Sequence, residues 1–319
     1  MINYIDLHIH SIYSDDGEFT VLKLMEKCQA AGIRIMSITD HNSVKANKEA
    51  KKISKDYGIK YINGIEVDCT YKGTNLHLLG YDFNENSIDF EIHEDKIMAG
   101  ERAASTKRLT LTRELGFQVL ESELNTISNL DDGKIWVGET FAEVLLGKPE
   151  YESHELLLPY RKGGERSDNP YVNFYWDYYS QNKPCYVHVD FPTFQEAISL
   201  IQRNGGKAVL AHPGKSIHRK GTSLNTRSSS LVQGVSTKYC LNFEKNKTIL
   251  EEMVSFGLDG VEVYCSYHSF DTAKVFYEIA MDLGLSMTCG SDFHGKAKPM
   301  VTLGGYDFSL VADSFPHII

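Results

Sequence analysis

A helical stretch followed by an apolar strand recurs four times in this chain, at residues 21–41, 194–214, 249–265 and 273–294. Each copy contains an amphipathic helical stretch, a glycine suited to end a helix, a short apolar stretch and then polar residues. Short strands that are apolar on both faces are typical of parallel sheets covered by helices. The repeat therefore predicts an α/β fold with parallel strands and crossover helices.

Reactive side chains follow the strand in every copy. They are Asp40, His41, His212, Tyr264, Asp292 and His294. In a βα barrel the carboxyl ends of the strands meet at one face, where sites are built. An open doubly wound sheet also gathers sites at strand ends, but it more usually carries a glycine-rich phosphate loop, which this sequence lacks. We therefore expect a barrel.

Two segments depart from the repeat. Residues 88–190 begin with a long helical pattern and continue into an aromatic, polar region, which predicts an inserted helical cap subdomain. Residues 1–87 and 191–319 would then form the barrel domain. Residues 215–247 are rich in Lys, Ser, Thr and Asn and are predicted to form a long loop beside the site.

The composition of the 319 residues excludes several classes of protein. A formal net charge of −10 argues against a stable nucleic-acid complex. No apolar run is long enough to span a membrane, and the N-terminus does not resemble a signal peptide. The six cysteines form no Cys-x-x-Cys motif, so we expect reduced thiols in a cytoplasmic protein.

The stretch "DLHIHSIYSDDG", which begins at Asp6, places His8 and His10 on one face of an expected strand. Glu66 and His77 flank an expected hairpin that turns near Lys72–Gly73, and the turn would bring them abreast. Together with residues at other strand ends, these side chains form a set of candidate metal ligands. The set is His8, His10, Asp15, His41, Glu66, His77, His212, Asp292 and His294.

Six imidazoles and three carboxylates are too many for one ion and suit two or three ions of Mn, Zn or Fe. Such ions would make the pocket positive although the chain is acidic, and the pocket would then attract a phosphate. A hydroxide bridging two ions would be the nucleophile that attacks phosphorus.

The chain resembles the PHP family, named for the polymerase and histidinol phosphatase enzymes that share it. The resemblance rests on an ordered set of motifs that covers most of residues 5–87 and 195–296. The motifs are "DLHIHSIYSD", "TDH" at 39–41, "GIEV" at 64–67, "HLLGY" at 77–81, "AHPG" at 211–214 and "GSDFHG" at 290–295. It implies a distorted seven-stranded βα barrel with a trinuclear metal site.

The resemblance also assigns the ligands to three ions. The first would be bound by His8, His10, Glu66 and Asp292; the second by Glu66, His77 and His212; the third by Asp15, His41 and His294. The segment "SDDG" has one residue more than the family's usual "SDG". We assign Asp15 as the ligand, and Asp16 is the alternative.

The helical insert between the hairpin and "AHPG" is similar to that of PHP phosphoesterases acting on small molecules. Some of these remove the 3′-phosphate of nucleoside 3′,5′-bisphosphates or shorten RNA from its 5′ end. The resemblance implies a substrate of this kind. Relatives often carry a phosphate-contacting "GRPH" motif in the insert, whereas this chain has Glu139 and Thr140 at the matching place.

Several residues are candidates for substrate contacts. His268 follows a strand and is our candidate for the leaving-group acid, although it could equally face water. Arg102 and Arg108 lie on the long helix, where a solvated face is the simpler interpretation. A basic patch after "AHPG" would replace the missing "GRPH" residues as phosphate binder; it contains Lys215, His218, Arg219 and Lys220.

The expected function is therefore the metal-dependent hydrolysis of a small phosphate ester. The sequence leaves three alternatives to this function open. The first is histidinol-phosphate phosphatase, which would use the same metals. The second is a C–N hydrolase on a related metallo-barrel, which rarely needs nine ligands. The third is a non-catalytic PHP module, which would often lose ligands. The sequence does not specify the oligomeric state.

Overall fold

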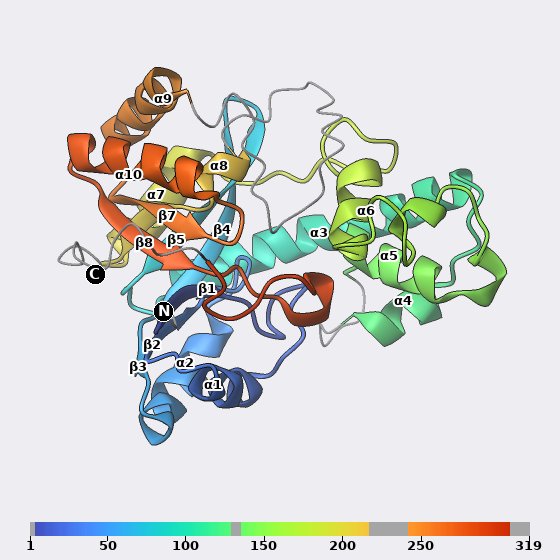
Figure 1. Ribbon diagram of the computed structural model, residues 1–319, viewed down its shortest axis with the longest axis horizontal. Helices are drawn as coiled ribbons and strands as arrows, with labels where there is room; N and C mark the ends of the chain where they lie inside the picture. Colours follow the sequence, from blue (N-terminus) through green and yellow to red (C-terminus); the bar gives the residue numbers. More distant parts are fainter. Residues whose placement is uncertain (1–3, 129–134, 217–241, 307–319) are drawn as a thin grey trace.

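The computed structural model describes residues 4–128, 135–216 and 242–306 (Figure 1). The strands are β1 (Ile5–Ile9), β2 (Ile35–Ile38), β3 (Lys60–Tyr61), β4 (Gly64–Tyr71), β5 (Thr74–Tyr81), β6 (Lys207–Leu210), β7 (Gly260–Cys265) and β8 (Ser286–Gly290). The longer helices are α1 (Val21–Ala30), α2 (Lys45–Ile53), α3 (Ile88–Glu114), α4 (Glu121–Ile127), α5 (Gly138–Gly147), α6 (Pro170–Tyr178), α7 (Phe194–Arg203), α9 (Phe243–Ser255) and α10 (Phe270–Leu283). Short helical turns are η1 (Ser54–Tyr57), η2 (Pro149–Tyr151), η3 (Leu158–Tyr160), α8 (Pro213–Ser216) and η4 (Gly295–Ala297).

The strands form two sheets. One is the parallel sheet β1-β2-β3, and the other has the order β4-β5-β6-β7-β8, in which β5 is antiparallel to both neighbours. The mixed α/β class is confirmed. A single closed barrel is not formed by the ladders between the described strands, because the short β3 ends the first sheet and the hairpin strand β5 interrupts the parallel order of the second.

Isolated bridges connect the two sheets close to the predicted site. Ile9 at the end of β1 pairs with Phe293, three residues after β8, and His41 pairs with Glu66 on β4. The Asp292 amide donates to the His8 carbonyl at 2.8 Å. The carboxyl end of β1 therefore lies between the ends of β2 and β8, and the motifs at these three strand ends are neighbours in space.

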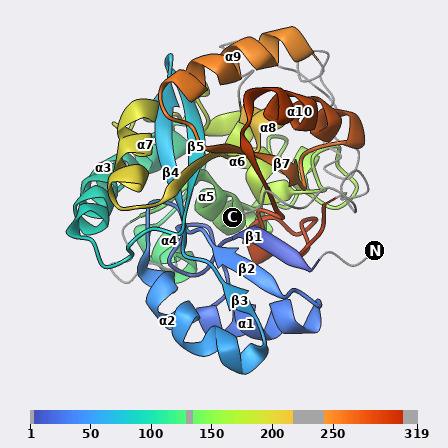
Figure 2. The ribbon, with the colours of Figure 1, turned by 90° about the vertical axis from the view of Figure 1, so that its left-hand side faces the viewer.

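All four predicted helix–strand repeats are present, as the pairs α1–β2, α7–β6, α9–β7 and α10–β8. Helix α7 shows why the sequence folds in this way locally. Thr193 and Glu196 form a capping box at its start, and its buried face contains Phe194, Ala197, Ile198 and Ile201. Figure 2 shows α1 and α2 against the first sheet, with α7, α9 and α10 around the second. Helices thus cover the apolar strands, as the pattern predicts.

The predicted hairpin is confirmed, but its register differs from the expected one. Lys72 and Gly73 form the turn between β4 and β5 with φ values of 49° and 78°. Across the ladder Asp68 is opposite His77, and Glu66 is opposite Leu79. Glu66 and His77 are therefore diagonal neighbours on one face of the hairpin rather than abreast.

The inserted segment has its own apolar cluster. Helix α3 extends over 27 residues from an N-cap at Ser87 away from the sheets (Figure 1). A separate cluster then joins α3 to the following helices, with Phe117, Phe141, Phe174 and Tyr179 among its buried members. We propose that residues 88–190 are the cap subdomain and that residues 1–87 and 191–319 are the PHP-like domain.

Three further expectations concern the rest of the chain. Most of the predicted loop at 215–247 lies outside the described residues, although helix α9 already begins at Phe243. The described cysteines, which are Cys28, Cys69, Cys185, Cys265 and Cys289, are buried and free. None of the helices in the three described ranges is long and apolar enough to cross a membrane.

Strand β8 lies so close to β1 that a methyl group added at Gly290 is expected to destabilise the fold. A Cβ atom on Gly290 would lie 2.6 Å from the His8 backbone nitrogen, which cannot move without disturbing the strand. We expect Gly290→Ala to lower the free energy of unfolding by about 1–3 kcal/mol, measured by urea denaturation. Gly147→Ala is the matched control, because no atom lies within 4 Å of the added Cβ there. Equal stability of the two variants would contradict the packing described.

Candidate metal centre

The Glu66 carboxylate lies at the centre of the site, fully buried on β4. Five imidazoles from four parts of the chain surround it. They are His8 and His10 with Nε2 each 3.1 Å from Oε2, His41 with Nε2 3.6 Å from Oε2, His77 with Nδ1 2.9 Å from Oε1, and His212 with Nε2 3.2 Å from Oε1. The structure thus brings together the residues that the separate sequence motifs contribute.

Asp292 and His212 reach the site from turns with strained backbone. Asp292 Oδ1 lies 3.4 Å from His8 Nε2 and 3.3 Å from His10 Nε2. His212 and Asp292 have positive φ values of 28° and 60°, a conformation that costs a non-glycine residue about 1–3 kcal/mol. Both residues stand two positions after a strand end, where the strained turns direct His212 toward Glu66 and Asp292 toward His8 and His10.

Nitrogen and oxygen atoms suited to cations cluster into three overlapping groups. The first contains His8, His10, Glu66 and Asp292; the second contains His41, Glu66 and His77; and the third contains His10, Asp16, His41 and His294. The first group is the ligand set predicted for the first ion. In the second, His41 accompanies the predicted Glu66 and His77, and His212 lies at the same Glu66 oxygen.

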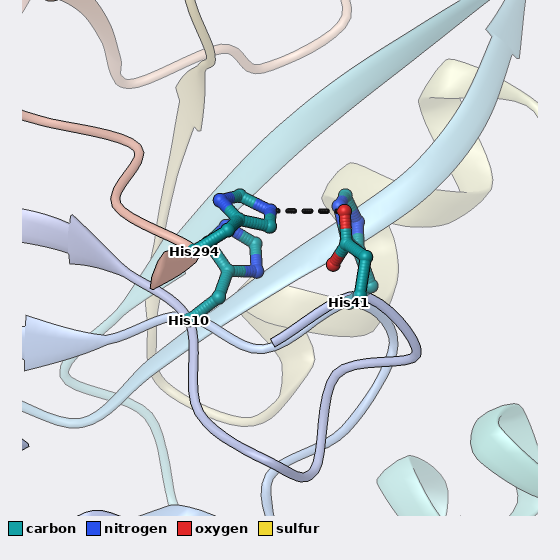
Figure 3. A group of neighbouring side chains, drawn as sticks. His10, His41 and His294 are labelled. Atoms are coloured by element: carbon teal, nitrogen blue, oxygen red, sulfur yellow. Dashed lines mark ion pairs between the residues drawn. The ribbon is translucent and has the colours of Figure 1, made fainter. Parts of the chain in front are cut away.

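The third group corrects one assignment. His294 Nε2 lies 3.2 Å from Asp16 Oδ2, and Ser14 Oγ donates to Asp16 Oδ1 at 3.1 Å. Asp16, rather than the predicted Asp15, therefore belongs to the group. The additional residue in "SDDG" shifts the ligand by one position, because the turn at Ser14 directs the second aspartate to the histidines. Figure 3 shows His10, His41 and His294 gathered here from three parts of the chain.

Asp15, which the sequence analysis assigned as the ligand, nonetheless lies close to the centre. Burial, reinforced by the negative charge of Asp16, raises the pKa of Asp15 to about 8. In contrast, burial is outweighed at Asp16 by the charge of His294, which holds the Asp16 pKa well below its usual range. The two neighbouring carboxyls therefore differ in environment, and Asp16 is the one that is charged beside the imidazoles.

The chain places a further carboxylate, Asp68, beside this cluster. Asp68 Oδ1 lies 3.3 Å from both His41 Nδ1 and His77 Nε2, and Asn42 donates to Asp68 Oδ2 at 2.7 Å. The sequence analysis missed Asp68. Its position two residues after Glu66 on the same strand face was the available signal, and the expected hairpin register concealed it.

Glu262 on β7 is a second missed residue. Its Oε1 accepts from His8 Nδ1 at 2.9 Å, and its Oε2 accepts from the His212 backbone amide at 2.8 Å. An imidazole that donates from one nitrogen to a carboxylate presents the other nitrogen as a ligand. Glu262 thereby orients His8 and fixes the backbone of His212. A charged residue inside the apolar strand "VEVY" was the signal in the sequence.

The donor set fits divalent metal ions. His10 Nε2 and His41 Nδ1 are buried and have no hydrogen-bond partner among the described residues, although carboxylate oxygens lie nearby. Imidazole nitrogens and carboxylate oxygens that converge in this way, with two of the nitrogens left without a hydrogen bond, are arranged as ligands of a shared cation. His8, His10, His41, His77, His212 and His294 would supply nitrogen, and Asp16, Glu66 and Asp292 would supply oxygen.

The charges of the buried side chains also agree with a site for divalent cations. Burial alone would raise the pKa of Glu66, but the charges of His8, His77 and His41 hold it well below its usual range. Burial lowers the pKa of His8, yet Glu66, Glu262 and Asp292 together raise it well above its usual value. Buried charges therefore persist only because each has a partner of opposite sign, and bound cations would take the place of the protons.

The predicted catalytic acid, His268, has backbone partners at both of its ring nitrogens. Its Nδ1 donates to the Val263 carbonyl at 2.7 Å, and its Nε2 accepts from the Gly214 amide at 3.0 Å. Burial lowers its pKa to about 4. Both ring nitrogens are thus occupied by backbone groups, and His268 connects the "AHPG" turn to strand β7.

The predicted substrate contacts have mixed outcomes. Arg108 donates to Glu101 at 2.6 Å within helix α3, so the carboxylate neutralises its charge. Arg102 is exposed. Lys215 alone of the basic patch is described, and it faces the centre with Nζ 4.0 Å from Asp292 Oδ2. His218, Arg219 and Lys220 lie outside the described residues.

A buried lysine that the sequence analysis missed also reaches the centre. Lys298 Nζ donates to Asp292 Oδ2 at 2.7 Å and lies 3.3 Å from His294 Nε2. Burial lowers its pKa, but Asp292 and Asp16 outweigh this effect and raise it, so the amine is charged. The sequence did not indicate this position for Lys298. Lys298 comes close to His294 and Asp292 only because the turn η4 reverses the chain between His294 and Lys298.

Helix α5 of the insert begins close to the same ligands. Burial and the charge of Asp16 raise the pKa of Glu139 to about 8, and the charge of Lys298 also acts on this side chain. Lys296 donates to Glu143 of α5 at 2.8 Å, which joins the turn η4 to the insert. The insert therefore forms one side of the centre.

The comparison with known families identifies the chain. The model of the PHP domain matches residues 6–163. This range contains Glu66 and five other candidate ligands, which are His8, His10, Asp16, His41 and His77. The chain belongs to the PHP family. Eight candidate ligands, with Asp16 in place of Asp15, belong to the three groups, and the ninth, His212, has its Nε2 3.2 Å from Glu66 Oε1.

Known proteins resemble this PHP chain over nearly its whole length. A 3′,5′-nucleoside bisphosphate phosphatase of Chromobacterium violaceum is 25% identical, covering 98% of this chain and 93% of the relative. A 5′-3′ exoribonuclease of Haemophilus influenzae is 23% identical over 91% of this chain and 89% of the relative. A solved Chromobacterium violaceum structure, named an amidohydrolase with bound sulfate and no metal, has a TM-score of 0.73 at 21% identity, covering 95% and 91% of the two chains. This last likeness shows the shared fold.

The geometry predicts different roles for the two neighbouring aspartates. We expect Asp16→Asn to lower the metal content of reconstituted protein by about one ion per chain, because the third group would lose its carboxylate ligand. Asp15→Asn, the matched control, should retain the wild-type content. Elemental analysis after metal loading and desalting measures both. The reverse result, with metal lost only in Asp15→Asn, would restore the original assignment.

Proposed function

We propose that this PHP protein is a metal-dependent phosphoesterase that hydrolyses small phosphate esters. The observation that carries the proposal is the overlap of the three ligand groups, which share Glu66, His10 and His41. Shared ligands hold cations close together, and such a cluster suits a phosphoryl group, which spreads negative charge over several oxygens.

We propose two to three ions of Mn, Zn or Fe as the cofactors. Nitrogen and carboxylate ligands together suit all three metals. When bound, the ions would supply the activation of water and the neutralisation of charge on the phosphoryl oxygens. Glu66 would hold neighbouring ions at a short distance, since each of its two oxygens faces a different set of imidazoles.

The proposed reaction consumes water and the ester. The oxygen of water forms a bond to phosphorus as the bond from phosphorus to the ester oxygen breaks, and the departing oxygen gains a proton. The products are an alcohol and a phosphate. We assign His268 no role in this step, because backbone groups occupy both of its nitrogens.

A nucleotide is the substrate class that we propose first, such as a nucleoside 3′,5′-bisphosphate or the 5′ end of a short RNA. The names of the relatives above support it, at low identity. Histidinol phosphate remains the alternative within the family. Glu139, where relatives carry a phosphate-contacting arginine, predicts that the distal part of the substrate is bound differently here.

A panel of substrates tests the proposal. Manganese-loaded protein would be offered a nucleoside 3′,5′-bisphosphate, a nucleoside 5′-monophosphate, a 5′-phosphorylated RNA trimer and histidinol phosphate. Released phosphate and chain shortening are measured separately. We expect turnover of at least one nucleotide and its loss after chelation. Absence of turnover on the whole panel, with metal present at two or more ions per chain, would contradict the proposal.

Two substitutions should remove activity at the centre. We expect Glu66→Gln and His212→Ala each to lower kcat/KM by about 100-fold or more. The first removes the negative charge at the centre, and the second removes the imidazole beside Glu66 Oε1. His188→Ala is the control, since His188 is exposed and paired only with Asp190 and Tyr186 among the described residues. Circular dichroism verifies the fold. Near wild-type activity of either variant at full metal content would refute its role.

A further inference from the structure

Two candidate ligands, His41 and His77, each lie between two carboxylates. His41 directs Nε2 toward Glu66 Oε2 at 3.6 Å and Nδ1 toward Asp68 Oδ1 at 3.3 Å. His77 directs Nδ1 toward Glu66 Oε1 at 2.9 Å and Nε2 toward the same Asp68 oxygen at 3.3 Å. We call the nitrogens that face Glu66 the inner nitrogens and those that face Asp68 the outer nitrogens. One Asp68 oxygen therefore faces the outer nitrogens of both rings.

The other oxygen of Asp68 is held by Asn42, in the turn after β2. Asn42 Nδ2 donates to Asp68 Oδ2 at 2.7 Å, and Asn42 Oδ1 accepts from the Asp68 backbone amide at 3.0 Å. Burial raises the pKa of Asp68, but His41 and His77 outweigh burial and lower it, so the carboxylate is ionised. Because a backbone N–H only donates and an ionised carboxylate only accepts, these two bonds fix which end of the Asn42 amide is oxygen.

His93, near the start of helix α3, supports Asn42 in turn. His93 Nε2 lies 3.0 Å from Asn42 Oδ1. Since that oxygen is an acceptor, the His93 nitrogen is the donor. Burial lowers the pKa of His93 to about 4, so this ring is neutral near pH 7. We call His93, Asn42 and Asp68 the outer network. Helix α3 begins the proposed cap subdomain, and the outer network connects that subdomain to the candidate metal centre.

We propose that Asp68 is a positioning residue for His41 and His77, held in place by the rest of the outer network. With a cation beside Glu66, the proton of the His77 ring belongs on the outer nitrogen, and the Asp68 charge keeps it there. The same oxygen lies at the same distance from His41 Nδ1, so its charge attracts that ring as well. The inference rests on the metal cofactors of the proposed function and does not depend on the substrate.

Aspartate and asparagine have the same shape but different hydrogen-bonding groups, so position 68 can be tested without creating a cavity. In Asp68→Asn, one oxygen and one NH₂ group would meet two donors, Asn42 Nδ2 and His77 Nε2. Whichever way the new amide faces, one donor meets another donor.

The double variant Asn42→Asp/Asp68→Asn exchanges the two groups. The carboxylate at position 42 would accept from the amide at position 68, whose oxygen would then face the outer nitrogens. Aspartate, like asparagine, tolerates the φ of 56° at position 42. The double variant therefore restores the acceptor beside the imidazoles, although it places no charge there.

The affinity for Zn²⁺ is the measurement that tests the proposal. Zinc is titrated into metal-free protein in competition with a chromophoric chelator, and circular dichroism verifies the fold. We expect Asp68→Asn to weaken the ion of the second ligand group, which contains both imidazoles, by about 10- to 100-fold. The ion of the first group should bind as in wild type, because that group contains neither His41 nor His77.

Three further variants make the result specific. The double variant should recover most of the lost affinity. His93→Phe, which removes the donor to Asn42, should weaken the same ion by a smaller factor. Asp190→Asn is the matched control and should equal wild type, because the Asp190 side chain is 91% exposed and pairs with His188.

Several outcomes would overturn the inference. They are wild-type zinc affinity in Asp68→Asn, an equal loss at every ion, and a double variant that binds as weakly as Asp68→Asn. Phosphate release from the substrate panel above, measured on the same preparations, separates this inference from the proposed function. Wild type that binds metal in the expected pattern but releases no phosphate contradicts the function alone, and active wild type with an unaffected Asp68→Asn contradicts the inference alone. Absence of zinc binding by wild type would overturn both.

Discussion

The structure depends on one buried carboxylate, Glu66, and on the five imidazoles around it. A carboxylate removed from water is stable only with compensating charge, and Glu66 receives it from residues of both sheets, including His77 on the other strand of the hairpin. Any displacement of β1, β2, β5 or β6 against β4 would separate a partner from it. The site is therefore also a contact between the two sheets, and metal binding and stability of the fold are expected to be coupled.

Residues outside the three ligand groups hold the candidate ligands in position. Glu262 orients His8 and the His212 backbone, and Asp40 accepts from the amide and hydroxyl of Ser11, which anchors the loop that carries Asp16. These carboxylates do not face the shared centre of the ligand groups. They hold imidazoles and loops in place, and they explain why so many acidic residues are buried in this chain.

Sequence patterns predicted the parts of the site that depend on local rules. Strand alternation places His8 and His10 together, and the helix–strand repeats place His41, His212 and Asp292 after strand ends. Errors arose where a local rule has two solutions. A shift of one residue exchanged Asp15 for Asp16, a shift of two in the hairpin register concealed Asp68, and His268 is a buried residue whose partners are backbone atoms that no side-chain pattern reveals.

The sequence by itself determined the α/β class, the four helix–strand units, the hairpin and nearly all of the residues that gather in the candidate metal centre, because periodicity and strand-end position are local properties. Only the tertiary structure decided that the strands form two sheets, that Asp16 supplies the carboxylate and that Glu262 and Lys298 enter the site. Those features depend on how strands from distant segments pair and on which charges burial forces together. Such pairings are set by the packing of the whole chain and have no fixed spacing in its sequence.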